Sequence, residues 1–148
     1  MKILAENKKA FFDYELLETY EAGIVLHGFE VKSIRAGHAS LKGAYVIIKD
    51  NEVYLINALI SPYQQANTPE NYDTQRTRKL LLKKSEIKSL IGKSKVKGLT
   101  LIALRLYTKK NKIKLEFAIG KGKRKIDKRE TIKKRETDRE IRREFRGR

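Results

Sequence analysis

The segment from Leu99 to Gly120 constrains the fold more than any other part of the sequence. From Lys112 onward it alternates between two residue sets, Ile113, Leu115, Phe117 and Ile119 against Lys112, Lys114, Glu116 and Ala118. Alternation with period two is typical of a β-strand that buries one side and exposes the other. The apolar run LTLIALRLY precedes it, and Lys109-Lys110-Asn111 separates the two halves. The segment predicts an antiparallel β-hairpin.

A second hairpin is predicted from two runs of β-branched and aromatic residues, Ala44 to Ile48 and Val53 to Ile56. The residues between them include Asp50 and Asn51, which tolerate the positive φ of a tight turn.

Two elements are predicted between Phe11 and Gly37. The stretch FFDYELLETYEAGIVL is expected to form a long strand with a bulge near Glu21 to Gly23, because a glycine inside a strand often marks a bulge. A helix over Tyr14 to Tyr20 is the alternative. Gly28 to Gly37 fits a two-turn helix that turns one apolar pair inward and one basic pair outward, with Gly37 as its stop: Val31 with Ile34, and Lys32 with Arg35. The same spacing also suits an ordinary charged surface helix.

The middle of the chain combines a long loop with a short helix. Residues 61–75 hold both prolines and the two tyrosines that are candidates for stacking on a nucleobase, Tyr63 and Tyr72. Ser85 is expected to cap a helix that ends at Gly92, with one apolar face formed by Ile87, Leu90 and Ile91.

Five or six strands in antiparallel pairs, two or three short helices and no repeat favour a small, partly closed barrel of the oligonucleotide-binding (OB) type. A two-layer sandwich is the alternative. The expected organisation is one domain over residues 1–120 and a tail over 121–148.

The tail is strongly basic, with 14 Lys or Arg and 6 Asp or Glu within a chain of net charge +17. Its few apolar residues cannot bury enough surface to offset the entropy of ordering, so we expect it to be mobile until it meets a polyanion such as RNA. A solubilising tail is the alternative. No stretch approaches the length of a membrane span, and no signal peptide is evident, so we expect a cytoplasmic monomer that binds no membrane.

The sequence offers no motif for catalysis. There is no cysteine, and the two histidines are too few for a zinc site, so no metal or cofactor is expected. Gly92-Lys93-Ser94 lacks the first glycine of a phosphate loop, and Gly120-x-Gly122 lacks a third glycine. His27, Glu30 and Asp13 have no catalytic spacing. We expect a binding protein.

In order along the chain, the sequence resembles the SmpB family, the tmRNA-binding proteins of bacterial ribosome rescue (trans-translation). The resemblance rests on NKKAFFDY at 7–14, ETYEAGIVL at 18–26, GFEVKSIRAG at 28–37, RTRKLLL at 76–82 and GKGKRKIDKR at 120–129. It implies a six-stranded OB-like barrel with about three helices. It also implies that the barrel binds the tRNA-like domain of tmRNA and that the tail enters the empty mRNA channel of a stalled ribosome, at the decoding centre.

The resemblance links Glu21, Leu81 and Lys114 to tmRNA binding. Lys114 suits a phosphate contact, whereas Glu21 would accept hydrogen bonds from a base or ribose, or orient a basic neighbour. Leu81 could contact an unstacked base or fill the core, and its apolar side chain favours the core. The remaining RNA-binding candidates form the basic surface of the body and the start of the tail: Lys32, Arg35, Arg76, Arg78, Lys79, Lys121 and Lys123.

The resemblance links Asp127, Lys128 and Arg129 to accommodation on the ribosome. Ile126 replaces an aromatic residue or histidine, and Thr74 and Lys83 also depart from the family's pattern. The other ribosome-binding candidates of the tail are Lys133, Lys134, Arg135, Arg139 and Arg142. In a helix, the residues Lys128, Arg135, Arg139, Arg142 and Arg146 share one face, so the tail is predicted to become helical when it binds.

Overall fold

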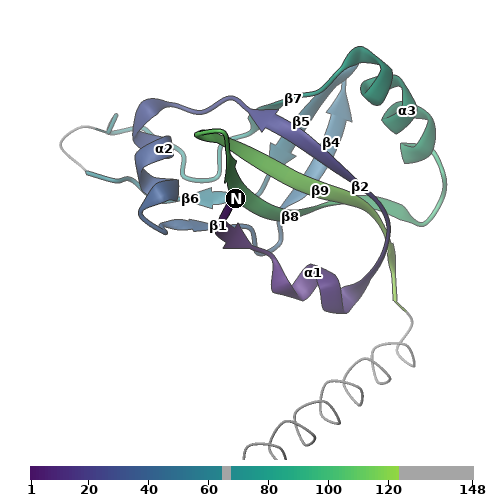
Figure 1. Ribbon diagram of the computed structural model, residues 1–148. Helices are drawn as coiled ribbons and strands as arrows, with labels where there is room; N and C mark the ends of the chain where they lie inside the picture. Colours follow the sequence, from purple (N-terminus) through teal and green to yellow (C-terminus); the bar gives the residue numbers. More distant parts are fainter. Residues whose placement is uncertain (65–67, 124–148) are drawn as a thin grey trace, which may run out of the picture.

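The computed structural model describes residues 1–64 and 68–123 and shows a barrel surrounded by three helices (Figure 1). Six strands form a closed ring in the order β8, β4, β5, β7, β2, β9 and back to β8, and β1 pairs with β8 outside the ring. All pairings are antiparallel. The OB-like barrel is confirmed, and the sandwich alternative is wrong.

The strands of the main sheet are β1 (Lys2–Glu6), β2 (Tyr14–Ile24), β4 (Tyr45–Lys49), β5 (Glu52–Ile56), β7 (Arg78–Leu81), β8 (Leu99–Lys109) and β9 (Lys112–Gly122). A separate two-stranded sheet contains β3 (Ala39–Ser40) and β6 (Leu59–Ile60). The helices are α1 (Lys8–Asp13), α2 (Gly28–Arg35) and α3 (Lys84–Ser94). No helix among the described residues has both the length and the apolar character needed to cross a membrane.

Both predicted hairpins are confirmed, and both turn through two residues with positive φ. The β4–β5 turn uses Asp50 and Asn51, at φ 51° and 62°. The β8–β9 turn uses Lys110 and Asn111, at φ 50° and 63°. Asparagine and aspartate adopt this region more readily than other residues, so they suit these positions.

The alternation in β9 is confirmed on its inner side, where Ile113, Leu115, Phe117 and Ile119 are buried. On the outer side Ala118 is buried as well, because α1 covers this part of the barrel. Ala10 of α1 packs there against Ile102, Leu104 and Ala118. The sequence interpretation missed both α1 and β1, whose short segments show no clear periodicity.

The long strand β2 is confirmed, and the helix alternative over Tyr14 to Tyr20 is wrong. The irregularity expected near Gly23 lies at Leu17 instead, where the register with β9 shifts between Leu16 and Glu18. Gly23 has a different role. It pairs with Leu81, whose Cβ would lie 3.3 Å from any Cβ added at Gly23.

Helix α2 is confirmed, with Ile34 buried, Lys32 and Arg35 exposed, and Gly37 at φ 85° after its end. The predicted cap and end of α3 are wrong. Ser85 lies inside the helix, and the carboxylate of Glu86 accepts a hydrogen bond from the backbone N–H of Lys83, 3.3 Å away. The helix continues past Gly92 to Ser94.

Strand β9 extends to Gly122, and the Lys123 backbone N–H donates to Asp13 O at 2.9 Å, so the ordered barrel includes Lys121 and Lys123. The ribosome-binding candidates between Ile126 and Arg142, and the helix predicted for the tail, lie outside the described residues.

A buried carboxylate joins three separate parts of the chain. Glu30 of α2 is fully buried and pairs with Arg78 of β7 at 2.8 Å and with Arg76. It also accepts a hydrogen bond from the Tyr72 hydroxyl at 2.9 Å. Burial alone would raise the pKa of Glu30, but the hydrogen bonds from Arg76, the His27 backbone, Arg78 and Tyr72 outweigh it and lower the pKa to about 2.

We expect Glu30→Gln to destabilise the fold by about 3–5 kcal/mol, because it leaves the buried Arg78 cation without its counter-charge. Denaturant unfolding at pH 7 measures this loss. Glu52→Gln is the control, since Glu52 pairs with Lys79 at an exposed position, and we expect it to cost much less.

The pH dependence of the stability lost in Glu30→Gln gives a second check. The folded pKa of Glu30 is about 2 and its ordinary value is 4.5, so its stabilising contribution is complete above 4.5 and is lost as the pH falls toward 2. The stability difference between wild type and Glu30→Gln should therefore narrow over that range. A difference independent of pH would contradict this assignment.

Candidate nucleic-acid interface

A shallow groove of about 350 Å³ gathers three of the predicted RNA-binding residues, Arg35, Leu81 and Lys114. Its walls come from β2, α2, the end of β7 and the β8–β9 hairpin, and the other lining residues are Gly23, Ile24, Leu26, Val31, Asn111, Lys112 and Ile113. Arg35 is held at the hairpin turn, because its guanidinium donates to Asn111 O at 3.0 Å. The groove combines an apolar floor with cations along its rim.

Leu81 is 54% exposed, so the interpretation of Leu81 as a core residue is wrong. The reason is its register in β7, where Arg78 and Leu80 face inward and Lys79 and Leu81 face outward. A run of three leucines hides this alternation in the sequence. A large apolar side chain at the rim of a basic groove suits contact with an unstacked base.

Glu21 lies on the outer side of β2 and has two partners from β8. The Tyr107 hydroxyl donates to its carboxylate, and Lys109 Nζ lies 3.2 Å from Oε1. The hydrogen bond from Tyr107 is the main cause of the lowered pKa of Glu21, and Lys109 and Lys114 lower it further. Glu21 therefore pairs with a basic neighbour, Lys109, and its role in RNA binding stays a prediction.

Arg78 does not belong to the basic surface, because its side chain is fully buried. Besides Glu30, its guanidinium donates to Ala58 O at 2.7 Å and to the Tyr72 hydroxyl at 2.9 Å. Arg76 shares Glu30 and keeps 25% of its side chain exposed. The sequence pattern RTRK could not distinguish a buried arginine from an exposed one.

The hydroxyl of Tyr72 is hydrogen-bonded to Glu30 and, at 3.1 Å, to Ile60 O, and its half-buried ring meets Phe29 edge-on, so its role in base stacking stays a prediction. Tyr63 is 43% exposed and remains a stacking candidate. Thr74, one of the departures from the family's pattern, contributes its backbone carbonyl to the same network, since it accepts from Arg78 at 3.0 Å.

The other predicted cations lie outside the groove. Lys32 is exposed on α2, and Lys79 pairs with Glu52 at 3.1 Å on the barrel wall. Lys121 is exposed near the end of β9, and Lys123 Nζ donates to Phe11 O at 3.4 Å. Lys114 lies near the opposite end of the same strand, so the groove and the start of the tail are at different ends of β9 (Figure 1).

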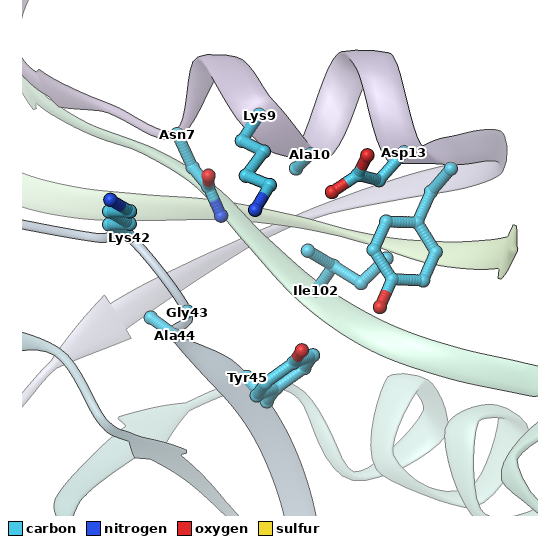
Figure 2. Close-up of a pocket in the computed structure, with 10 residues that line it drawn as sticks. Asn7, Lys9, Ala10, Asp13, Lys42, Gly43, Ala44, Tyr45 and Ile102 are labelled. Carbon is cyan, nitrogen blue, oxygen red and sulfur yellow. The ribbon is translucent and has the colours of Figure 1, made fainter. Parts of the chain in front are cut away.

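A second, smaller cavity of about 170 Å³ lies between α1 and the junction of β4 with β8. Figure 2 shows Lys9 pointing from α1 into this space, with the Asp13 carboxylate directed toward Lys9 and Tyr45 on the far side. A hydrogen bond with Tyr45 is the main cause that raises the pKa of Tyr14 to about 12. Tyr14 is therefore neutral at pH 7.

The sequence interpretation missed several residues of the groove and its surroundings: Tyr107, Lys109, Asn111 and Lys112. Their positions depend on which strands pair, and β2 pairs with β9, almost a hundred residues away in the chain. His27, Glu30 and Asp13 do not form a catalytic cluster, since Glu30 is committed to the arginines. Within residues 1–64 and 68–123, no group of three or more His, Asp or Glu could hold a metal ion.

A closed antiparallel barrel with cations and exposed apolar side chains on one wall is the architecture of the OB-type oligonucleotide-binding domains. The sequence profile of the SmpB protein family matches residues 4–147. The chain belongs to the SmpB family.

Relatives and a solved structure agree with this family. The SsrA-binding protein of Cupriavidus necator is 54% identical over 144 residues, covering 97% of this chain and 96% of that protein. The SsrA-binding protein of Halothermothrix orenii is 50% identical over 148 residues, covering 100% and 95%. A chain of the solved structure described as "tmRNA-SmpB: a journey to the center of the bacterial ribosome" has a TM-score of 0.69 and 43% identity, covering 89% of this chain and 95% of that one.

The hydrogen bond from Tyr107 leads to a testable prediction about the pKa of Glu21. Tyr107→Phe removes this donor, so the pKa of Glu21 should rise toward its ordinary value. A pH titration of the Glu21 carboxyl carbon by NMR measures the change. Lys109→Met is the comparison and should raise the pKa less; an unchanged Glu21 pKa in Tyr107→Phe would contradict the assigned contact.

Proposed function

We propose that this protein binds SsrA RNA (tmRNA), without catalysing a reaction, and delivers it to stalled ribosomes for trans-translation in the cytoplasm. One observation carries the proposal: SsrA-binding proteins match almost the whole chain at about half identity. The likeness to a chain of the tmRNA-SmpB structure supports the ribosome as the second partner. The basic groove supplies a physical reason for affinity to RNA.

In this proposal the groove holds the tRNA-like domain of tmRNA. Lys114 and Arg35 contact phosphates, and Leu81 packs on an unstacked base. Glu21 acts through Lys109, which it holds beside the groove. Lys32, Lys79 and the exposed part of Arg76 add phosphate contacts around it, whereas Arg78 acts only by positioning α2 and β7.

The tail is proposed to serve the ribosome rather than tmRNA. Lys121 and Lys123 would support its start, and Asp127, Lys128 and Arg129 would act at the decoding centre, beside Ile126. The tail's remaining cations would follow the mRNA channel as a helix. A chain that orders only on binding would make engagement depend on an empty channel.

Competition between tmRNA and an unrelated RNA, at about 0.15 M salt, tests the proposal, because contacts to phosphate alone would weaken equally for every RNA. Preference for tmRNA supports the proposal. Equal affinity for both RNAs would reduce the protein to a general RNA binder.

Lys114→Ala and Leu81→Ala should both weaken tmRNA binding, but in different ways. Loss of the Lys114 phosphate contact should reduce the slope of log affinity against log salt by about 1. Loss of Leu81 should lower the affinity and leave the slope unchanged, because its contact is apolar. Affinity measurements between low and high salt distinguish the two.

Lys88→Ala is the matched control for these variants. Lys88 is an exposed lysine of α3 and lies outside the groove, so its loss should change the affinity much less than that of Lys114. Equal effects of Lys88→Ala and Lys114→Ala would contradict the placement of tmRNA in the groove.

Removal of residues 124–148 should leave the affinity for tmRNA nearly intact and abolish tagging on stalled ribosomes. The cut falls after Lys123 because that residue is still bonded to α1 through Asp13 and Phe11. Binding and an in-vitro tagging assay are measured on the same preparation. A truncated protein that loses its affinity for tmRNA would contradict the assignment of tmRNA binding to the barrel and of ribosome binding to the tail.

A further inference from the structure

Three aromatic rings form a short ladder where β2 leads into α2. The rings of His27 and Phe29 are stacked, with centroids 5.4 Å apart and planes at 18°. The Phe29 ring meets the Tyr72 ring edge-on, with centroids 4.8 Å apart. His27 is exposed, Phe29 and Tyr72 are half-buried, and the ladder therefore runs from the protein interior to its surface.

The inner end of the ladder is fixed. The Tyr72 hydroxyl donates to Glu30 and accepts from Arg78, both of which are fully buried. The outer end is fixed as well, since the His27 backbone N–H donates to the Glu30 carboxylate at 2.8 Å. The backbone of His27 is therefore held in place, and its exposed ring is supported by the stacked ring of Phe29.

The residues around His27 suit the binding of RNA. Leu26, the preceding residue, lines the basic groove. Arg76, which is partly exposed, donates to Val25 O on the other side of this connection, and Lys32 is exposed on α2. A rigid, exposed ring beside a basic groove can stack on a nucleobase while nearby cations contact its phosphate.

We propose that His27, supported by Phe29, is a stacking platform for one unpaired nucleobase of the bound RNA. This inference rests on the proposed function, and it adds a site next to the groove in which neither Leu81 nor Lys114 takes part. An RNA strand that lies in the groove would pass His27 as it leaves along Leu26.

The test measures the affinity of the full-length protein for tmRNA over a range of salt concentrations. Variants His27→Ala, His27→Gln and His27→Trp are compared with wild type and with Leu81→Ala. Base–aromatic stacking corresponds to a loss of affinity between about fivefold and about a hundredfold per base, and an exposed platform is expected toward the lower end. We expect His27→Ala and His27→Gln to bind about tenfold more weakly, and His27→Trp to bind at least as tightly as wild type.

The salt dependence separates stacking from charge. Stacking predicts the same loss at every salt concentration and an unchanged slope, whereas loss of a phosphate contact would reduce the slope. A reduced slope for His27→Ala with no rescue by His27→Trp would overturn the platform. Equal affinity of His27→Ala and wild type, with Leu81→Ala weakened, would also overturn it and leave the proposed function standing.

Failure of the proposed function has a different signature: wild type would not prefer tmRNA over unrelated RNA. The backbone hydrogen bonds of His27 are kept in all three variants, and thermal unfolding checks that the fold is kept.

Discussion

The groove and the aromatic ladder depend on one buried interaction, the pairing of Glu30 with Arg76 and Arg78. A buried carboxylate is costly unless cations and hydrogen bonds replace its water, and here four donors do so. Because Glu30 belongs to α2 and Arg78 to β7, the pairing fixes the helix against the strand that carries Leu81. The same carboxylate anchors Tyr72 and the backbone of His27. One buried carboxylate thus sets the geometry of two surfaces that we propose to contact RNA.

The second constraint is the long β8–β9 hairpin, which pairs along its whole length and also carries β2 on its other side. Its turn lies at the groove, where Asn111 holds Arg35. Its other end reaches α1 through Lys123. The seven residue steps from Lys114 to Lys121 span about 23 Å in an extended strand. The hairpin therefore separates the groove from the point where the tail begins, as the proposed adaptor with two RNA partners would require.

Local patterns in the sequence were sufficient for the parts of the fold that have a periodicity of their own. The alternation of β9, the turn residues Asp50 and Asn51, and the glycine after α2 all predicted what the structure contains. Short elements without a pattern, such as α1, were missed. Only some of the predicted RNA-binding residues lie in the groove. Lys114 and Arg35 do, whereas Arg78 is buried although it belongs to the same basic run as Lys79.

The sequence by itself determined the class of fold, the family and the excess of positive charge, because strand alternation, turn residues and family motifs are local properties of the chain. Only the tertiary structure decided which charges face solvent. Arg78 and Leu81 show why: strand register and long-range pairing bury a cation and expose a leucine, and neither depends on the residue type alone. The aromatic ladder likewise exists only because Glu30 brings Tyr72 to Phe29 from a segment about forty residues away.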